Sequence, residues 1–282
     1  MTGVQEPVVA GAEGVGAFEA LERRIWSGRA AAYAASFARL CAHPVPALLD
    51  AAGVRPGSTV LDVGTGTGTV AAAACARGAR VVAVDAEPSM LAEARRAAPE
   101  AEVRAATLPE LPFPDGAFDC VVGNFVLNHV GRPADALAEL RRVLRPGGRL
   151  ALTTWAAPAP PGQSLLGRAF EAAGAVRPAD FPPPPAALAA VTEPGAFTAL
   201  LTGAGLRSVH GRVLSWNHRA TADDWWAGPA TGVAFLGELL HRQEPDVQLG
   251  IRREFDRLAA EFLDADGRLA LPHAALLVSA QR

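Results

Sequence analysis

A glycine-rich run, Leu61–Thr69 (LDVGTGTGT), lies between a predicted strand at 58–63 and a predicted helix that ends near Arg77. Its glycines allow a sharp turn and a close approach of a ligand to the backbone, and the helix that follows presents free N–H groups. Asp85 ends the next predicted strand, 80–84, where its carboxylate can accept hydrogen bonds from ribose hydroxyls. This combination predicts a nucleoside-containing cofactor bound beside the sheet.

Strands and helices keep alternating after this loop, which predicts an α/β fold with a parallel, doubly wound, Rossmann-like sheet. The segment 118–123 (FDCVVG) is nearly all apolar, as is typical of a strand covered on both faces. Further strands are expected at 101–105, 149–154, 206–216 and 269–280, and helices at 88–98, 133–145, 163–175 and 193–203.

Composition divides the rest of the chain. The first residues are rich in glycine, the region 158–192 is rich in proline, and 221–264 has helical patterning. We therefore expect one α/β core with N-terminal helices and a helical lid built from insertions, and no independent second domain. The expected segments are a flexible tail at 1–16, a helical cap at 17–53, a cofactor-binding core at 54–157, a lid insertion at 158–192, further core at 193–219, a helical insertion at 220–266 and a final core strand at 267–282.

Charge and composition exclude several classes of function. All 26 basic residues are arginine, so a lysine Schiff base, a pyridoxal-phosphate anchor and a Walker-type phosphate loop are excluded. A net charge of −3 gives no basic surface for nucleic acid or an anionic membrane. No apolar run approaches the ~20 residues of a membrane span, and the N-terminus lacks a signal-peptide pattern, so we expect a soluble, cytoplasmic protein.

The cysteines and histidines predict neither a disulfide nor a metal site. Cys41, Cys75 and Cys120 lie far apart and form no C-x-x-C pair, and the six histidines show no metal-binding spacing. We therefore expect no bound metal.

The spacing of the loop glycines separates two classes of cofactor. A dinucleotide site prefers G-x-G-x-x-G, which would require glycine where this chain has Thr69. The G-x-G-x-G spacing found here favours a cofactor without a diphosphate over NAD. An NAD-linked oxidoreductase stays open as the weaker alternative.

Four segments in this order resemble those of class I S-adenosylmethionine (SAM)-dependent methyltransferases, in the branch of ubiquinone/menaquinone-type and many natural-product enzymes. They are Leu61–Gly68 (LDVGTGTG), Val84–Leu91 (VDAEPSML), Leu111–Asp119 (LPFPDGAFD) and Arg142–Gly148 (RVLRPGG). The resemblance implies SAM as the cofactor. It also implies a seventh, antiparallel strand at the sheet edge, for which 269–280 is the candidate.

The resemblance implies roles for the loop and for the end of the following strand. Gly64 and Gly66 would pass close to the methionine part of SAM, with Thr65 between them also in contact with the cofactor. Asp62 would lie near the amino group of SAM, and Asp85 would hold the ribose hydroxyls.

The adenine end of the cofactor follows in the same way. The resemblance places Ala86 and Met90 at the border of the adenine, and Leu108 would offer its backbone N–H to the ring. Thr107 stands where such enzymes usually have an Asp or Asn that contacts the adenine amino group, which implies a weaker contact there.

Candidate residues near the methyl group come from two parts of the chain. By the resemblance, Asn124 and Phe125 would lie beside the transferable methyl. His129 follows them and is the candidate general base, because the pKa of histidine suits that role. The alternative is that His129 packs in the loop and orients the cofactor. Tyr33, the only tyrosine, would cover the sulfonium or hydrogen-bond the cofactor, or simply pack on its helix.

Four tryptophans and one histidine are candidates for an apolar wall around a bulky or aromatic acceptor. The alternative is that the tryptophans fasten the lid to the core. The candidates are Trp155, Trp216, His218, Trp225 and Trp226. The remaining histidines, expected at surface or strand positions, are His43, His210, His241 and His273.

The favoured function is methyl transfer from SAM to a small, fairly apolar metabolite, in secondary metabolism. Oxygen is the first expectation for the acceptor atom because His129 could act as a base, and nitrogen and carbon stay open. A second hypothesis is a SAM-binding protein that catalyses another reaction, such as cyclisation. A non-catalytic binding protein is a further alternative without positive support. The expected partner is the small-molecule substrate, with no nucleic acid and no membrane, and the oligomeric state is not predicted.

Overall fold

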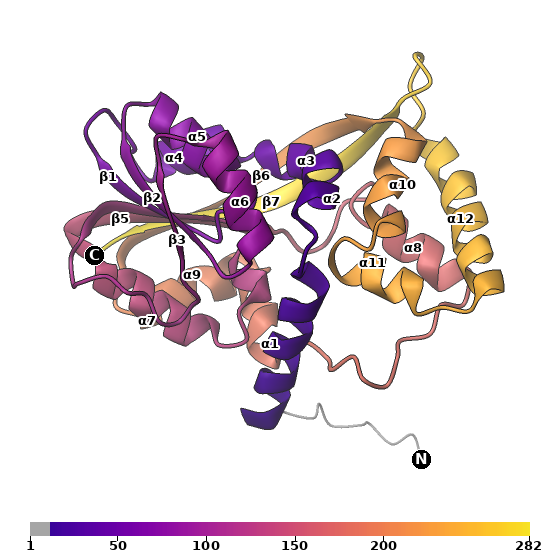
Figure 1. Ribbon diagram of the computed structural model, residues 1–282, viewed down its shortest axis with the longest axis horizontal. Helices are drawn as coiled ribbons and strands as arrows, with labels where there is room; N and C mark the ends of the chain where they lie inside the picture. The colour runs from indigo at the N-terminus through magenta and orange to yellow at the C-terminus, as the bar shows by residue number, and fades with distance from the viewer. Residues whose placement is uncertain (1–11) are drawn as a thin grey trace.

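The computed structural model describes residues 12–282, and over that range one seven-stranded sheet forms the core (Figure 1). The strand order is β3-β2-β1-β4-β5-β7-β6; β1 to β5 are parallel, and β7 is antiparallel to both of its neighbours. The strands are β1 (Thr59–Val63), β2 (Arg80–Asp85), β3 (Glu102–Ala105), β4 (Phe118–Asn124), β5 (Leu144–Trp155), β6 (Arg207–Ala220) and β7 (Leu269–Gln281). The predicted fold is confirmed, with β7 one strand in from the edge rather than at the edge itself.

Helices cover both faces of this sheet. Successive residues of a strand point to opposite faces, so Val60 and Val122 pack on one side while Leu61 and Val121 pack on the other. The first face is covered by α4 (Val45–Ala51) and α5 (Thr69–Ala76), with α6 (Pro88–Ala97) beside α5, and the second by α7 (Pro133–Val143) and α9 (Pro194–Gly203). This double cover explains why the central strands are almost wholly apolar.

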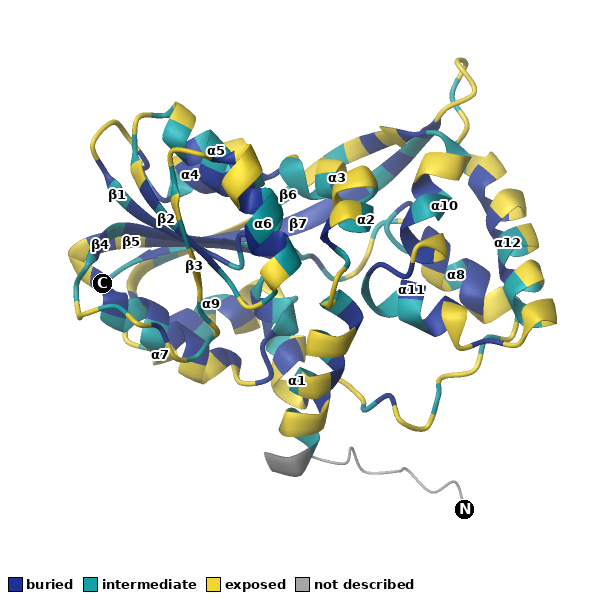
Figure 2. Ribbon diagram, in the orientation of Figure 1, coloured by how far each residue is buried: buried dark blue, intermediate teal, exposed yellow. Residues whose placement is uncertain are grey.

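A helical module lies beside one end of the sheet, on the right of Figure 1. It consists of α8 (Leu165–Ala172), α10 (Ala222–Ala230), α11 (Ala234–His241) and α12 (Pro245–Ala259). Helix α8 packs against α12, and Phe170 and Phe255 are buried in the apolar cluster that joins them. Figure 2 shows buried residues along the inner sides of these helices. The two predicted insertions therefore form one unit.

The expected end of the lid insertion at 192 does not coincide with a structural division. The short 3-10 helix Ala186–Val191 packs with α7 and α9, where Leu188 and Val191 are buried in the same cluster as Phe197. Only the first part of 158–192, which contains α8, belongs to the helical module.

Three N-terminal helices cover the carboxyl ends of the parallel strands. The tail predicted at 1–16 is wrong for 12–16, which are helical, and residues 1–11 lie outside the described part of the chain. The buried stripe of Phe18, Leu21 and Ile25 holds this first helix in place despite two glycines of low helix propensity in its first turns. The helices are α1 (Ala12–Trp26), α2 (Ala30–Ala35) and α3 (Ala38–Ala42). No helix within 12–282 has the length and apolar character that a bilayer crossing requires.

Candidate active site

One cavity of about 780 Å³ opens where the carboxyl ends of β1, β2 and β4 meet the N-terminal helices and the helical module. Its walls differ in chemistry from one end to the other. We call one part the loop end, which is lined by Gly64, Gly66, Asp85, Ala86, Met90, Thr107 and Leu108. We call the other part the aromatic end, which is lined by Phe37, Phe125, Trp155, Trp225 and His273.

The glycine loop is held against the end of β2 by hydrogen bonds. The Thr65 N–H donates to the Val84 carbonyl at 3.0 Å, and the Gly66 N–H donates to Asp85 Oδ2 at 2.8 Å. The second oxygen of Asp85 accepts the Glu87 N–H at 3.0 Å, and burial raises the pKa of this carboxyl. Each carboxylate oxygen keeps a free lone pair, so Asp85 can still accept hydrogen bonds from hydroxyls of a ligand.

Asp62 lies beneath the loop rather than in the cavity wall. It is fully buried, and the Thr65 hydroxyl donates to its Oδ2 at 2.6 Å. Its Oδ1 has no partner among the described residues, and burial raises the pKa of the carboxyl to about 7. Neither Asp62 nor Thr65 lines the cavity, so the direct cofactor contacts predicted for these two side chains are not part of this geometry.

Two glycines of the loop serve different purposes. A Cβ on Gly64 would lie 2.5 Å from Val126 Cγ2, so this position needs glycine for packing. A Cβ on Gly66, whose φ is +53°, would have Tyr33 Cε1 as its nearest neighbour at 4.0 Å. Tyr33 lines the cavity and stands edge-on to Trp26, with ring centroids 5.7 Å apart. The loop at Gly66 and the ring of Tyr33 thus face each other across the cavity, and a Cβ at Gly66 would touch the ring.

The residues expected around an adenine ring lie together at the loop end. Within the described chain the Leu108 N–H has no backbone acceptor, so it is available to a ligand. Glu87, which the sequence analysis passed over, closes the rim of the cavity. Its carboxylate accepts the Met90 N–H at 2.9 Å at the start of α6 and the Gly28 N–H at 3.1 Å from the turn after α1.

Asn124 and Phe125 lie where the two ends of the cavity meet. The Asn124 amide donates to the Cys41 carbonyl at 2.8 Å, and its oxygen accepts the Thr153 hydroxyl at 2.6 Å. The side chain of Asn124 therefore ties α3 to the sheet. Phe125 has φ of +55°, and its ring stacks on Trp155 with centroids 4.1 Å apart.

Comparison with known proteins agrees with this geometry. Residues 61–152 match the family of methyltransferase domains. Over 112 residues, the chain is 43% identical to a demethylmenaquinone methyltransferase of Beutenbergia cavernae, covering 40% of this chain and 47% of that relative. The chain carries a class I SAM-dependent methyltransferase domain.

The methyltransferase domain shares its fold with solved structures at low identity. A putative methyltransferase of Bacillus halodurans has a TM-score of 0.54 and 20% identity, covering 85% of this chain and 98% of that one. The [4+2]-cyclase SpnF has a TM-score of 0.51 and 18% identity, covering 87% of this chain and 82% of its own. Likeness at these identities speaks for the fold alone. The match to the curated relative likewise spans less than half of that relative's length.

SAM, the cofactor of this domain family, fits the residues at the loop end. Gly66 leaves room beside the loop where a Cβ would otherwise project, and Asp85 offers carboxylate oxygens to hydroxyl groups. Met90 and Leu108 provide apolar surface for a ring. Asp62, which lies behind the loop and not in the cavity wall, would hold the loop through Thr65 rather than touch the cofactor.

His129 of the methyltransferase domain has both ring nitrogens engaged. Its Nδ1 lies 2.8 Å from Glu22 Oε2, and since a carboxylate only accepts, Nδ1 carries the proton. Its Nε2 lies 2.8 Å from the Asn128 amide nitrogen, which donates to it. No lone pair of His129 is left to take a proton from the methyl acceptor. This geometry therefore supports the alternative that His129 packs in the loop and orients the cofactor, and it does not support the predicted role as a base.

The four candidate tryptophans, which lie outside residues 61–152, divide into two groups. Trp155 and Trp225 line the aromatic end, while Trp216 lies behind Trp155 with ring centroids 6.4 Å apart. His218 packs on Trp225 at 5.4 Å without lining the cavity, and Trp226 packs against Phe255 in the helical module at 5.3 Å. The geometry therefore supports an acceptor contact for the first two and a packing role for the others.

His273 is a residue that the sequence analysis underestimated. It was expected at an ordinary surface or strand position, yet it is 2% exposed and lines the aromatic end. The sequence around His273 is an apolar strand and does not indicate a site. The position of His273 in the cavity wall depends on the residues that pack beside β7 from distant parts of the chain. Gln163 and Phe37 line the cavity as well and were likewise not predicted.

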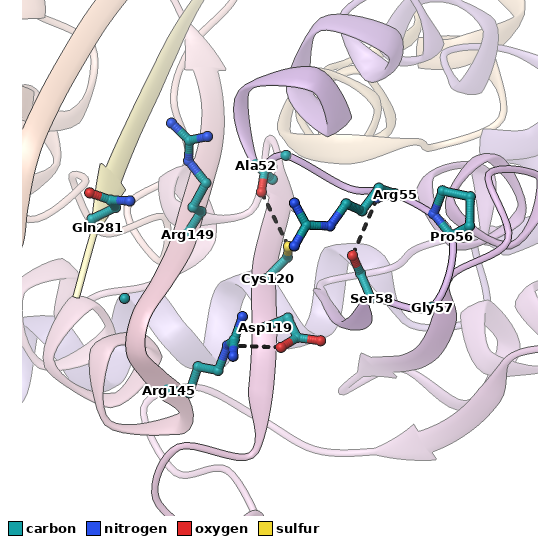
Figure 3. A pocket seen from close by; sticks show the side chains of 12 residues that line it. Ala52, Arg55, Pro56, Gly57, Ser58, Asp119, Cys120, Arg145, Arg149 and Gln281 are labelled. Carbon is teal, nitrogen blue, oxygen red and sulfur yellow. Dashed lines mark hydrogen bonds and ion pairs between the residues drawn. The ribbon is translucent and has the colours of Figure 1, made fainter.

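A second cavity of about 440 Å³ lies at the amino ends of β1 and β4 (Figure 3). There Arg145 pairs with Asp119 at 2.8 Å, and Asp119 also accepts the Thr59 N–H at 2.7 Å. The Cys120 thiol donates to the Ala52 carbonyl at 3.2 Å. These contacts fasten loops to the sheet, and no residue of the predicted site lies among them. Among residues 12–282 no group of His, Cys, Asp and Glu side chains is arranged to hold a metal.

Proposed function

We propose that this chain transfers the methyl group of SAM to a small, largely apolar acceptor, in the first place to an oxygen atom. The observation that carries the proposal is the single cavity that joins the loop end to the aromatic end. Cofactor and acceptor would therefore share one space between the sheet and the N-terminal helices.

The residues of the chain would act by binding and alignment. When bound, SAM supplies a methyl group on a positively charged sulfur, and an acceptor displaces it in line. Holding two reactants in the correct relative orientation lowers the activation free energy by up to about 7–11 kcal/mol in favourable cases. Asp85 would accept hydrogen bonds from the ribose hydroxyls, and Tyr33 with Trp26 would cover the cofactor and exclude water. An aromatic face is also a favourable neighbour for a cation.

The aromatic end supports an acceptor that contains a ring. Phe37, Phe125, Trp155 and Trp225 provide flat apolar surface, and such side chains favour stacked or edge-to-face contact with another ring. The matched relatives named demethylmenaquinone methyltransferases act, by that name, on a small molecule. We extend to this chain only the class, a small and mainly apolar acceptor.

The test begins with calorimetric titration of the folded protein with SAM, S-adenosylhomocysteine and NADH. Micromolar binding of the first two and none of NADH is the expected result. A panel of hydroxylated ring compounds is then incubated with SAM, and each methylated product must appear together with one equivalent of S-adenosylhomocysteine. Binding of NADH alone would contradict the proposal. A product formed while SAM stays intact through many turnovers would favour the cyclase-like alternative.

A further inference from the structure

The aromatic end contains two polar side-chain atoms that protein partners leave free. His273 and Gln163 both line the cavity. The Gln163 oxygen accepts the Ala274 N–H at 3.1 Å, which fixes the amide beside β7 next to His273. No described residue accepts a hydrogen bond from the Gln163 Nε2 group. This nitrogen is not buried away from solvent, and because Gln163 lines the cavity we infer that the nitrogen faces it.

The hydrogen bond of His273 shows which ring nitrogen carries a proton. Its Nδ1 lies 2.9 Å from the Leu271 carbonyl, and because a carbonyl only accepts, Nδ1 carries the proton. Burial lowers the pKa of the ring to about 4, so at neutral pH the ring is neutral and Nε2 carries a lone pair. Nε2 has no hydrogen-bond partner among the described residues. It is accessible although the residue is buried, so we infer that it also faces the cavity.

The surroundings of these two groups are aromatic. The His273 ring centroid lies 6.1 Å from Trp155, 5.3 Å from Trp225 and 6.1 Å from Trp216. The wall that contains this hydrogen-bond acceptor and this donor is thus mainly aromatic. In such a wall a polar group that a ligand leaves unpaired is costly, so these two atoms select for a hydrogen-bond donor and a hydrogen-bond acceptor on the ligand.

We propose that His273 and Gln163 bind a ring bearing two neighbouring oxygens, one of them a hydroxyl. The hydroxyl donates to His273 Nε2, the neighbouring oxygen accepts from the Gln163 amide, and the ring contacts Trp155 and Trp225. As a statement about the methyl acceptor this rests on the proposed function, whereas the binding itself is tested without methyl transfer. His273 is then an acceptor-binding residue.

The probe pair is 2,3-dihydroxynaphthalene and 2,3-dimethoxynaphthalene, which have the same ring but differ in the hydroxyl that His273 would accept. Affinities are measured by calorimetry in the presence of S-adenosylhomocysteine. We expect the wild-type protein to bind the diol at least about tenfold more tightly than the dimethoxy compound. His273→Phe should abolish this preference, and Gln163→Leu should weaken binding of the diol.

His218→Phe is the matched control, because His218 is a buried histidine of the same aromatic cluster that does not line the cavity. It should keep the tenfold preference. His273→Gln places an amide oxygen near the position of Nε2 and should restore part of the preference, which also guards against misfolding of the Phe variant. Lack of preference in the wild type, or preference kept in His273→Phe, overturns the proposal. Diol binding without binding of S-adenosylhomocysteine would instead overturn the proposed methyl transfer and leave this inference standing.

Discussion

At the scale of single residues, burial shifts the pKa values of acidic and basic side chains in opposite directions. It raises the pKa of Asp62 to about 7 and lowers that of His273 and His218 to about 4. The histidines are therefore neutral at neutral pH. Asp62, in contrast, changes charge near neutrality, so its contribution to stability varies over the pH range in which the protein would work.

Replacing Asp62 by asparagine should change how stability depends on pH. The folded protein holds the Asp62 proton more tightly than the unfolded chain does, so unfolding releases a proton between about pH 4 and pH 7. The contribution of Asp62 to the free energy of unfolding therefore falls as the pH rises through this window. In urea unfolding at pH 4.5 and 7.5, the wild type should lose stability relative to Asp62→Asn on going to the higher pH. Parallel pH curves for the two proteins would contradict a raised pKa.

Gly66→Ala should weaken cofactor binding with little other damage. The new methyl group would project from the loop into the cavity wall next to Tyr33, so we expect the affinity for S-adenosylhomocysteine to fall at least about tenfold, as a steric clash with a bound ligand requires. Gly57→Ala is the matched control, since Gly57 also has positive φ, +83°, and no atom lies within 4 Å of its Cβ position. Both variants should lose about 1–2 kcal/mol of stability, because alanine is strained at positive φ. Equal affinities in calorimetry would show that Gly66 does not border the cofactor.

At the scale of elements, helix α1 is held by its buried apolar stripe and by several polar contacts, one of which is centred on Glu22. Glu22 accepts from His129 at 2.8 Å and from the Trp26 indole at 3.2 Å. A second contact, from the Gly28 N–H to Glu87, holds the turn after the helix at 3.1 Å. Glu22 thus links the helix that covers the cavity to the segment that follows β4.

His129→Ala and Glu22→Ala should therefore have the same effect. Each removes one partner of the same contact, so we expect a higher KM for SAM and little change in kcat, and the double variant should be no worse than either single one. Steady-state kinetics with a confirmed acceptor measures this. If His129 were the general base, His129→Ala alone would lower kcat by roughly 100-fold or more and would alter the pH profile.

Elements differ in how far the sequence predicts them. The β-α units from β1 to β5 follow from local periodicity and turn residues, and so does the cavity wall made by Gly66 and Asp85, which lie at strand ends. The placement of β7 between β5 and β6 is not local, because it depends on which distant strands pair. For the same reason the engagement of His129 by Glu22, 107 residues away, and the role of His273 could not be predicted from spacing.

At the scale of the whole molecule, the elements that line the cavity differ in how they pack against the rest of the protein. The sheet lies in one extended apolar cluster and the helical module in another, and strand β7 contributes to both, whereas α1 to α3 lie across the opening of the cavity. Binding of S-adenosylhomocysteine should therefore slow hydrogen exchange most in residues 12–42 and least in α12. Exchange mass spectrometry with and without the ligand measures this, and protection centred on the module instead would contradict it.

Strand β7 also determines how freely the helical module can move. Leu269 and Leu271 are buried with the module, while Leu276 and Val278 further along the same strand are buried with the sheet. A continuous strand cannot act as a hinge without breaking its ladder to β5 and β6. We therefore expect the module to be a fixed wall that unfolds together with the sheet as one cooperative unit. We expect entry and exit of ligands to depend on the N-terminal helices, and a chimaera that exchanges the module would have to exchange β7 with it.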